Sequence, residues 1–191
     1  MNGTNFLLNS GCKKLPVDLL KIISENGISL IPYSNFYTNK NIKQKILYYL
    51  SHDGFSIKKD GKYIIFYNDE IKNKRRIRWT LAHELIHIYS GHLEENFINF
   101  DPKLDKYVDY QTVKLLCPTI ILKLCNIKSP KEIQKLCNVS LAVSQNAYQR
   151  LLSKKNYQFY NFTREEQKLA YNFSKFIEQY NNYKFLKEIY F

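Results

Sequence analysis

The sequence predicts an α+β fold in which a small β-sheet in the N-terminal half is followed by helices that continue to the C-terminus. Two observations lead to this expectation. Apolar runs rich in β-branched and aromatic residues flank Asp60-Gly61, a dipeptide typical of tight hairpin turns. Beyond the hairpin, apolar residues instead recur at the three- and four-residue spacing of amphipathic helices.

The N-terminal half is expected to form two helices and three strands ahead of a longer helix that contains residues 77–88. Apolar spacing over 17–25 predicts a helix that Gly27 ends, and residues 28–32 form a short apolar strand. A second helix is expected at 41–51. The hairpin strands are expected at 55–57 and 63–67.

Helices are expected throughout the C-terminal half. They span 104–117, which ends at Pro118, a short apolar segment at 120–124, then 130–137, 141–152 and a last helix from about 163 to 180. A capping box at Thr163 to Glu166 starts that last helix. The helices at 130–137 and 141–152 suggest a helix-turn-helix pair. Four aromatic residues of the last helix are expected to pack in the core: Tyr171, Phe173, Phe176 and Tyr180.

Length and composition place the chain among ordinary globular proteins. With 191 residues, of which 45% are hydrophobic, it can bury a substantial core, and it contains no apolar run long enough to span a membrane. The first fifteen residues lack the charged start and apolar stretch of a secretory signal, so a cytoplasmic location is expected. The four cysteines form no CxxC pair and are expected to be free thiols in or near the core: Cys12, Cys117, Cys125 and Cys137.

The net charge of +12, from 29 basic and 17 acidic residues, makes a nucleic-acid partner a possibility that the sequence does not favour, because lysines are spread along the whole chain. The densest basic run precedes the longer helix. This run is expected to be the solvated start of a helix. If it were instead a functional patch, it would attract an acidic or nucleic-acid-bound partner. The dependence of partner binding on salt concentration distinguishes the two interpretations. The run consists of Lys72, Lys74, Arg75, Arg76 and Arg78.

Residues 83 to 87 read His-Glu-Leu-Ile-His, an HExxH motif typical of zinc-dependent peptidases. Residues four apart on a helix project from one face, so His83 and His87 can bind a single metal ion together. Zinc accepts two neutral imidazoles, a third protein ligand and a water, whose pKa it lowers to about 7. Glu84 is then the expected general base that takes a proton from this water.

The flanks of the motif favour a metal site over ordinary polar residues on a half-buried helix. An apolar stripe at helical spacing is already present without the histidines, which therefore lie on an adjoining face with no packing role. That stripe consists of Ile77, Leu81, Leu85 and Ile88.

Three positions are candidates for the third ligand. Asp105 is favoured because it opens the next helix and is followed one turn later by Asp109, which can hydrogen-bond a ligand imidazole through its other nitrogen. His92 and Glu95 are the alternatives, and both follow the end of the motif helix. The spacing to His92 differs from the metzincin pattern, in which glycine follows the second histidine by three residues.

These segments resemble the ImmA/IrrE-type metallopeptidases. Residues 76–87, Arg-Ile-Arg-Trp-Thr-Leu-Ala-His-Glu-Leu-Ile-His, are similar to the family helix R-x-T-x-A-H-E-L-x-H, with Ile86 where glycine is usual. Residues 105–118 are similar to the family element E-x-E-A-N-x-F-A-A-E-L-L-M-P, whose first glutamate is the third zinc ligand. Residues 136–150 resemble the small helical element that follows, so the resemblance covers about residues 54–152.

The resemblance implies a zincin-like domain over residues 1–152 with a C-terminal helical extension at 153–191. Asp105 stands at the glutamate position and is shorter by one methylene, about 1.5 Å, so either the two metal-binding helices lie closer together or the metal site is weaker.

The resemblance further implies cleavage of a helix-turn-helix repressor, often encoded beside the peptidase on a phage or other mobile element. The competing expectation is a non-catalytic regulator that binds a repressor or DNA through its basic surface and C-terminal helices. A third is an interaction module that a metal ion stabilises.

Overall fold

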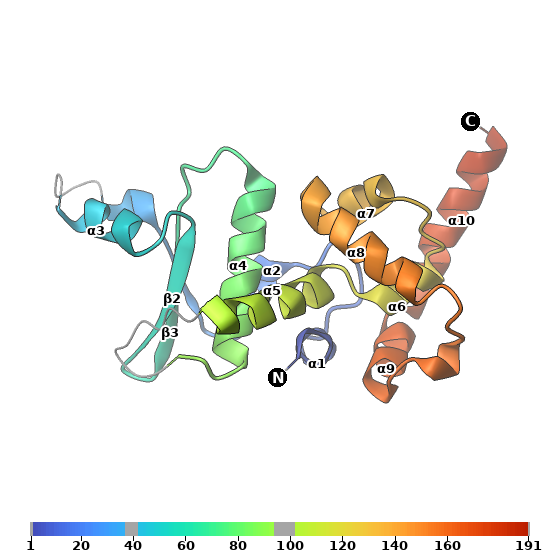
Figure 1. The fold of residues 1–191 in the computed structure, drawn as a ribbon, viewed down its shortest axis with the longest axis horizontal. Coiled ribbons are helices and arrows are strands. Elements are labelled where there is room, and N and C mark those ends of the chain that lie inside the picture. Colours follow the sequence, from blue (N-terminus) through green and yellow to red (C-terminus); the bar gives the residue numbers. More distant parts are fainter. Residues whose placement is uncertain (1, 37–41, 94–101, 191) are drawn as a thin grey trace. The chain divides into compact units, whose positions relative to one another are not determined.

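The computed structural model describes residues 2–36, 42–93 and 102–190, and the α+β class is confirmed by a three-stranded sheet and many helices within them (Figure 1). The chain divides into two compact units. The first spans 18–112, and the second combines 2–17 with 113–191. The boundary therefore falls inside α5 (Pro102–Leu116), whereas the expected boundary at residue 152 lies in α8 (Leu141–Ser153), within the second unit.

The first unit holds the sheet, the HExxH helix and the start of α5. Its predicted helices and strands are present, with ends that differ by at most three residues from the expected ones. In chain order they are α2 (Leu19–Glu25), β1 (Ser29–Pro32), η1 (Tyr33–Phe36), α3 (Ile42–Leu50), β2 (Gly54–Lys59), β3 (Lys62–Tyr67) and α4 (Lys74–Tyr89).

The strands are ordered β1-β3-β2, so β2 lies at one edge of this sheet. β1 runs parallel to β3, while β2 and β3 form the predicted antiparallel hairpin. Both turn residues have positive φ, 50° at Asp60 and 72° at Gly61, as a type I′ turn requires. Phe55 lies opposite Phe66, and their rings stack with centroids 5.0 Å apart.

Helix α4 packs against this hairpin and against α2 (Figure 1). The Asn73 side chain caps its first turn by accepting a hydrogen bond from the backbone N–H of Arg75 at 3.1 Å, and Gly91, with φ of 72°, follows its end. The predicted apolar stripe is buried at Leu81, Leu85 and Ile88. This packing fixes the rotation of α4 about its axis, and with it the direction of His83 and His87.

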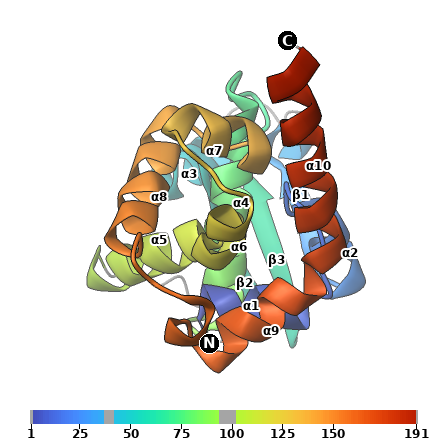
Figure 2. The ribbon, with the colours of Figure 1, turned by 90° about the vertical axis from the view of Figure 1, so that its right-hand side faces the viewer.

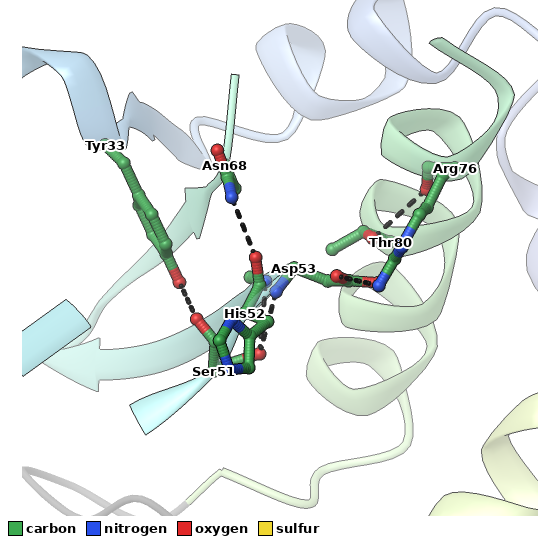
Figure 3. Close-up of polar contacts among 8 residues, drawn as sticks. Tyr33, Ser51, His52, Asp53, Asn68, Arg76 and Thr80 are labelled. Atoms are coloured by element: carbon green, nitrogen blue, oxygen red, sulfur yellow. Dashed lines mark hydrogen bonds and ion pairs between the residues drawn. The ribbon is translucent and has the colours of Figure 1, made fainter. Parts of the chain in front are cut away.

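The loop 51–53 ties the start of β2 to α4 and β3 (Figure 3). The Arg76 guanidinium donates two hydrogen bonds to the Asp53 carboxylate, at 2.8 and 2.7 Å. Asn68 donates from its side chain to the His52 carbonyl at 2.9 Å, and Tyr33 donates from its hydroxyl to the Ser51 carbonyl at 3.0 Å. Arg76, one member of the basic run at 72–78, therefore helps to orient β2.

Gly54, the first residue of β2, allows the backbones to approach closely. A Cβ atom there would lie 2.6 Å from the Phe66 carbonyl oxygen and 2.7 Å from the Thr80 methyl group. Both distances are well inside van der Waals contact, so a side chain at this position would push β2 away from α4.

The second unit is helical. It contains α1 (Gly3–Asn9), the end of α5, α6 (Thr119–Leu124), α7 (Pro130–Cys137), α8, η2 (Phe159–Asn161), α9 (Arg164–Asn172) and α10 (Ser174–Tyr190). α1 was not expected from the sequence; the Asn2 side chain caps it and it packs against α9 (Figure 2).

The single helix expected from 163 to 180 is wrong, because the chain breaks at Phe173 into α9 and α10. Phe173, the residue between the two helices, is fully buried. The capping box at Thr163 is confirmed. The expectation that all four aromatic residues pack in the core fails at Tyr171, which is 70% exposed.

The expected state of the cysteines is confirmed. None forms a disulfide; three are buried and Cys12 is partly exposed. Among the residues described, no helix combines the length and the apolar character needed to cross a membrane.

Candidate metal centre

Three ligand atoms from two helices converge in the first unit. His83 and His87 lie one turn apart on α4, and Asp105 lies in the first turn of α5. The Nε2 atoms of the two histidines are 3.1 Å apart. The Asp105 Oδ1 atom lies 3.3 Å from Nε2 of His87 and 3.9 Å from Nε2 of His83. Within the described residues this is the group of side chains able to hold a metal ion.

These separations fit a tetrahedral ion. Bonds of about 2.0–2.1 Å at the tetrahedral angle place neighbouring ligand atoms about 3.3 Å apart. Two of the three distances between ligand atoms lie within a few tenths of an ångström of this value. The longest distance, 3.9 Å, joins His83 to the half-exposed Asp105. The Asp105 side chain is shorter than the glutamate found at this position in the family that the sequence resembles, but its carboxylate still lies next to both histidines.

Asp109 holds His83 from the opposite side of the ring. Its Oδ1 atom lies 3.0 Å from Nδ1 of His83. A carboxylate accepts only, so Nδ1 carries the proton; in the neutral ring this leaves the lone pair on Nε2, the nitrogen beside His87 and Asp105 that would bind a metal ion. This is the position that the sequence analysis predicts for Asp109.

The two histidines have opposite pKa shifts. Burial lowers the pKa of His83, but the hydrogen bond to Asp109 and the nearby carboxylates of Glu84 and Asp105 outweigh it, so the net shift is upward. At His87, burial together with the neighbouring His83 and His92 lowers the pKa to about 4. His87 is therefore neutral at physiological pH, the form in which an imidazole binds a metal.

Glu84 lies beside the ligands and is only 8% exposed. Burial raises the pKa of its carboxyl to about 7, although His83 and a hydrogen bond from Ser56 act in the opposite direction. The Ser56 hydroxyl donates to Oε2 of Glu84 at 2.6 Å. Ser56 belongs to β2, so the hairpin orients this carboxylate. A carboxyl group with this pKa exchanges protons near neutral pH.

All of these groups open into one cavity of about 300 Å³. The ligands, Glu84 and Asp109 line one part of it, and residues of the edge strand β2 line another. Its other lining residues are Ser51, Asp53, Gly54, Phe55, Ser56, Trp79, Thr80 and Leu93.

The alternative third ligands have different outcomes. His92 stands edge-on to the His87 ring, with centroids 5.4 Å apart, and is not part of the converging group. Glu95 lies outside the described residues. Ser56 and Asp53 were not predicted from the sequence; a serine between two apolar residues, Phe55 and Ile57, was the available signal for Ser56.

The buried carboxyl of Glu84 predicts a pH-dependent stability of the metal-free protein. Its raised pKa favours folding fully below pH 4.5, and this contribution is lost as pH rises through about 7. Glu84→Gln cannot ionise, so in chelator it should exceed the parent in stability by about 3 kcal/mol at pH 8 and match it at pH 4. Urea unfolding at both pH values measures this difference, and equal curves at pH 8 would contradict it.

No family model, curated protein or solved structure matches the chain, so the geometry of His83, Glu84, His87, Asp105 and Asp109 is the basis for assigning a function.

Proposed function

We propose that the protein is a zinc-dependent endopeptidase. The observation that carries the proposal is the juxtaposition of the three converging ligand atoms with the buried Glu84 carboxylate in one open cavity. A purely structural metal site is closed by a fourth protein ligand, whereas a catalytic site has three protein ligands and an open position. The described residues supply three ligands and a cavity in front of them.

Two imidazoles and one carboxylate favour zinc over magnesium or calcium, which prefer oxygen ligands alone. Bound there, zinc would polarise a carbonyl group and make water acidic enough to ionise near neutral pH. The hydrogen bond from His83 to Asp109 supports the same assignment, because ligand histidines in zinc enzymes commonly donate their second N–H to a carboxylate.

Glu84 takes the proton of the attacking water at a carboxylate oxygen and transfers it to the amine that leaves. Burial raises the pKa of its carboxyl above the ordinary value, which favours the transfer of the proton onward to the leaving amine. Ser56 acts as a positioning residue: its hydrogen bond holds Oε2, which leaves the other oxygen directed to the proton transfer.

Strand β2 is the proposed binding element for the substrate. It is the edge strand beyond β3, and its residues 54–56 line the cavity that holds the ligands. An extended peptide can pair with such an edge through backbone hydrogen bonds. The arrangement of HExxH helix, hairpin and ligand helix is the basis for proposing a zincin-like fold.

The proposed substrate is a helix-turn-helix repressor of a phage or other mobile element, and the resemblance to ImmA/IrrE-type metallopeptidases supports this choice. A peptidase that acts inside the cell must spare other proteins, so we expect cleavage at one or a few positions of one partner.

The test is incubation of the zinc-loaded protein with the repressor encoded nearest its gene, followed by mass spectrometry of the fragments. We expect discrete fragments that a chelator abolishes and that added zinc restores. Tight binding to the repressor without cleavage, unchanged by the chelator, would identify a non-catalytic regulator instead.

A further inference from the structure

The excess positive charge is concentrated in the second unit. Its residues, 2–17 and 113–191, include 15 basic and 5 acidic side chains, a net charge of +10. The first unit has 14 basic and 12 acidic side chains, a net charge of +2, although the two units are similar in length. If the net charge only reflected the lysine-rich composition of the chain, the two units would carry similar net charges. The peptidase site lies in the first unit, so it does not account for this surface.

Helices α7 and α8 form a compact pair joined by three residues (Figure 2). Ser129 and Ser140 cap the two helices by accepting backbone hydrogen bonds from Glu132 and Val143. Between the helices, Asn138 adopts the left-handed conformation with φ of 52°. This is the build of a helix-turn-helix, in which the turn sets the angle of the second helix.

The inward side of the pair is closed by small and medium-sized side chains, which fix one helix against the other. Each is at most 2% exposed: Ile133, Cys137, Val139, Ser144 and Ala147. The outward side of α8 is different. It presents three amide side chains at helical spacing, Gln145, Asn146 and Gln149, next to Leu141, which is 48% exposed.

These are side chains suited to the edges of base pairs. Asparagine and glutamine can form paired hydrogen bonds with adenine in the major groove, and an apolar side chain can contact the methyl group of thymine. In helix-turn-helix proteins the N-terminal half of the second helix makes such contacts, and Leu141, Gln145 and Asn146 all lie in that half of α8.

The first helix of the pair, α7, carries positive charge that can attract the phosphates of a nucleic acid. Lys128 precedes α7, Lys131 and Lys135 lie on it, and all three are exposed. Its acidic residue, Glu132, forms an ion pair with Lys184 at 2.7 Å, which neutralises it. The Tyr148 hydroxyl of α8 donates to the Lys128 carbonyl at 2.6 Å, so the lysine-bearing start of α7 is held to α8.

We propose that α7 and α8 bind double-stranded DNA in a sequence-dependent way, with α8 in the major groove and the three lysines near phosphates. Double-stranded DNA fits better than an acidic protein because the amide-bearing helix and the lysines lie on one helix-turn-helix. This activity is separate from the proposed peptidase and does not depend on it.

The experiment starts with a pool of random-sequence 25-base-pair duplexes, from which the full-length protein selects its preferred sequence. Fluorescence anisotropy then measures affinity for the selected duplex and for an unrelated one at several salt concentrations. Gln145→Ala, Asn146→Ala or Gln149→Ala should weaken binding to the selected duplex by about tenfold each and leave the unrelated duplex nearly unchanged. The Glu84→Gln variant should bind as the parent does.

The triple variant K128Q/K131Q/K135Q should weaken binding to both duplexes by at least about tenfold and reduce the slope of log affinity against log salt by about 2 to 3. The matched control K59Q/K62Q/K72Q removes three exposed lysines from the first unit and should bind as the parent does. The proposal is overturned if selection enriches no sequence, if the two triple variants lose affinity equally, or if single-stranded RNA binds more tightly than the selected duplex. Circular dichroism confirms that each variant is folded.

Discussion

Replacement of Glu84 by glutamine is expected to lower peptidase activity by at least about 100-fold while zinc remains bound. Glutamine has the same shape and can still accept the hydrogen bond from Ser56, so the cavity is preserved. It cannot take a proton from water. Rates of repressor cleavage and zinc content by atomic absorption, measured on the same preparation, separate the loss of the base from the loss of the metal.

The matched control is Glu25→Gln, which makes the same chemical change on the exposed end of α2 and should leave the rate unaltered. If Glu84→Gln cleaves at the parent rate, hydrolysis does not pass through this carboxylate and the proposed mechanism is wrong. If it loses zinc as well, Glu84 is needed to build the site, and its role as a base is not isolated.

Removal of any one of the three ligands should abolish stoichiometric zinc binding. His83→Ala, His87→Ala and Asp105→Ala each leave two protein ligands, too few for a stable zinc site, so affinity should fall by more than the 10- to 100-fold that is typical for loss of a second partner such as Asp109. Competition with a chromophoric chelator measures these affinities.

The fourth histidine of the chain provides a control of the same residue type. His52 is exposed in the loop before β2, and His52→Ala should bind zinc as the parent does. Full zinc occupancy in His87→Ala would remove the central claim. Loss of zinc in His92→Ala or Glu95→Ala, with retention in Asp105→Ala, would show that the third ligand is misassigned.

The sequence was sufficient for the parts of the site that depend on local periodicity. His83 and His87 share a face because α4 is a regular helix, and the apolar stripe that leaves this face to line the cavity is local too. Asp105 and Asp109 follow the same logic on α5. Their shared helix face and the resemblance both favoured an approach to the histidines, but nothing in the spacing of 83–109 fixes the distance between two helices.

The parts that could not be predicted depend on contacts between distant segments. Ser56 meets Glu84 across 28 residues, and Asp53 meets Arg76 across 23, because the hairpin packs against α4. The prediction of short helices from the sequence fails for a related reason. α1 has only seven residues, too few to be stable alone, and its packing on α9 stabilises it. The break at Phe173 has no glycine or proline to mark it in the sequence, and the burial of the Phe173 ring depends on contacts with other segments.

The placement of β2 at the edge of the sheet has a consequence for which parts of a protein can be cut. An edge strand such as β2 can form backbone hydrogen bonds only with a segment whose own N–H and C=O groups are unpaired. In a helix or an interior strand these groups are already paired within the target protein. On the proposed function, susceptibility is then a property of the target's conformation as much as of its side chains. A folded repressor would be vulnerable in the linkers between its domains, and any ligand that orders such a linker would protect it.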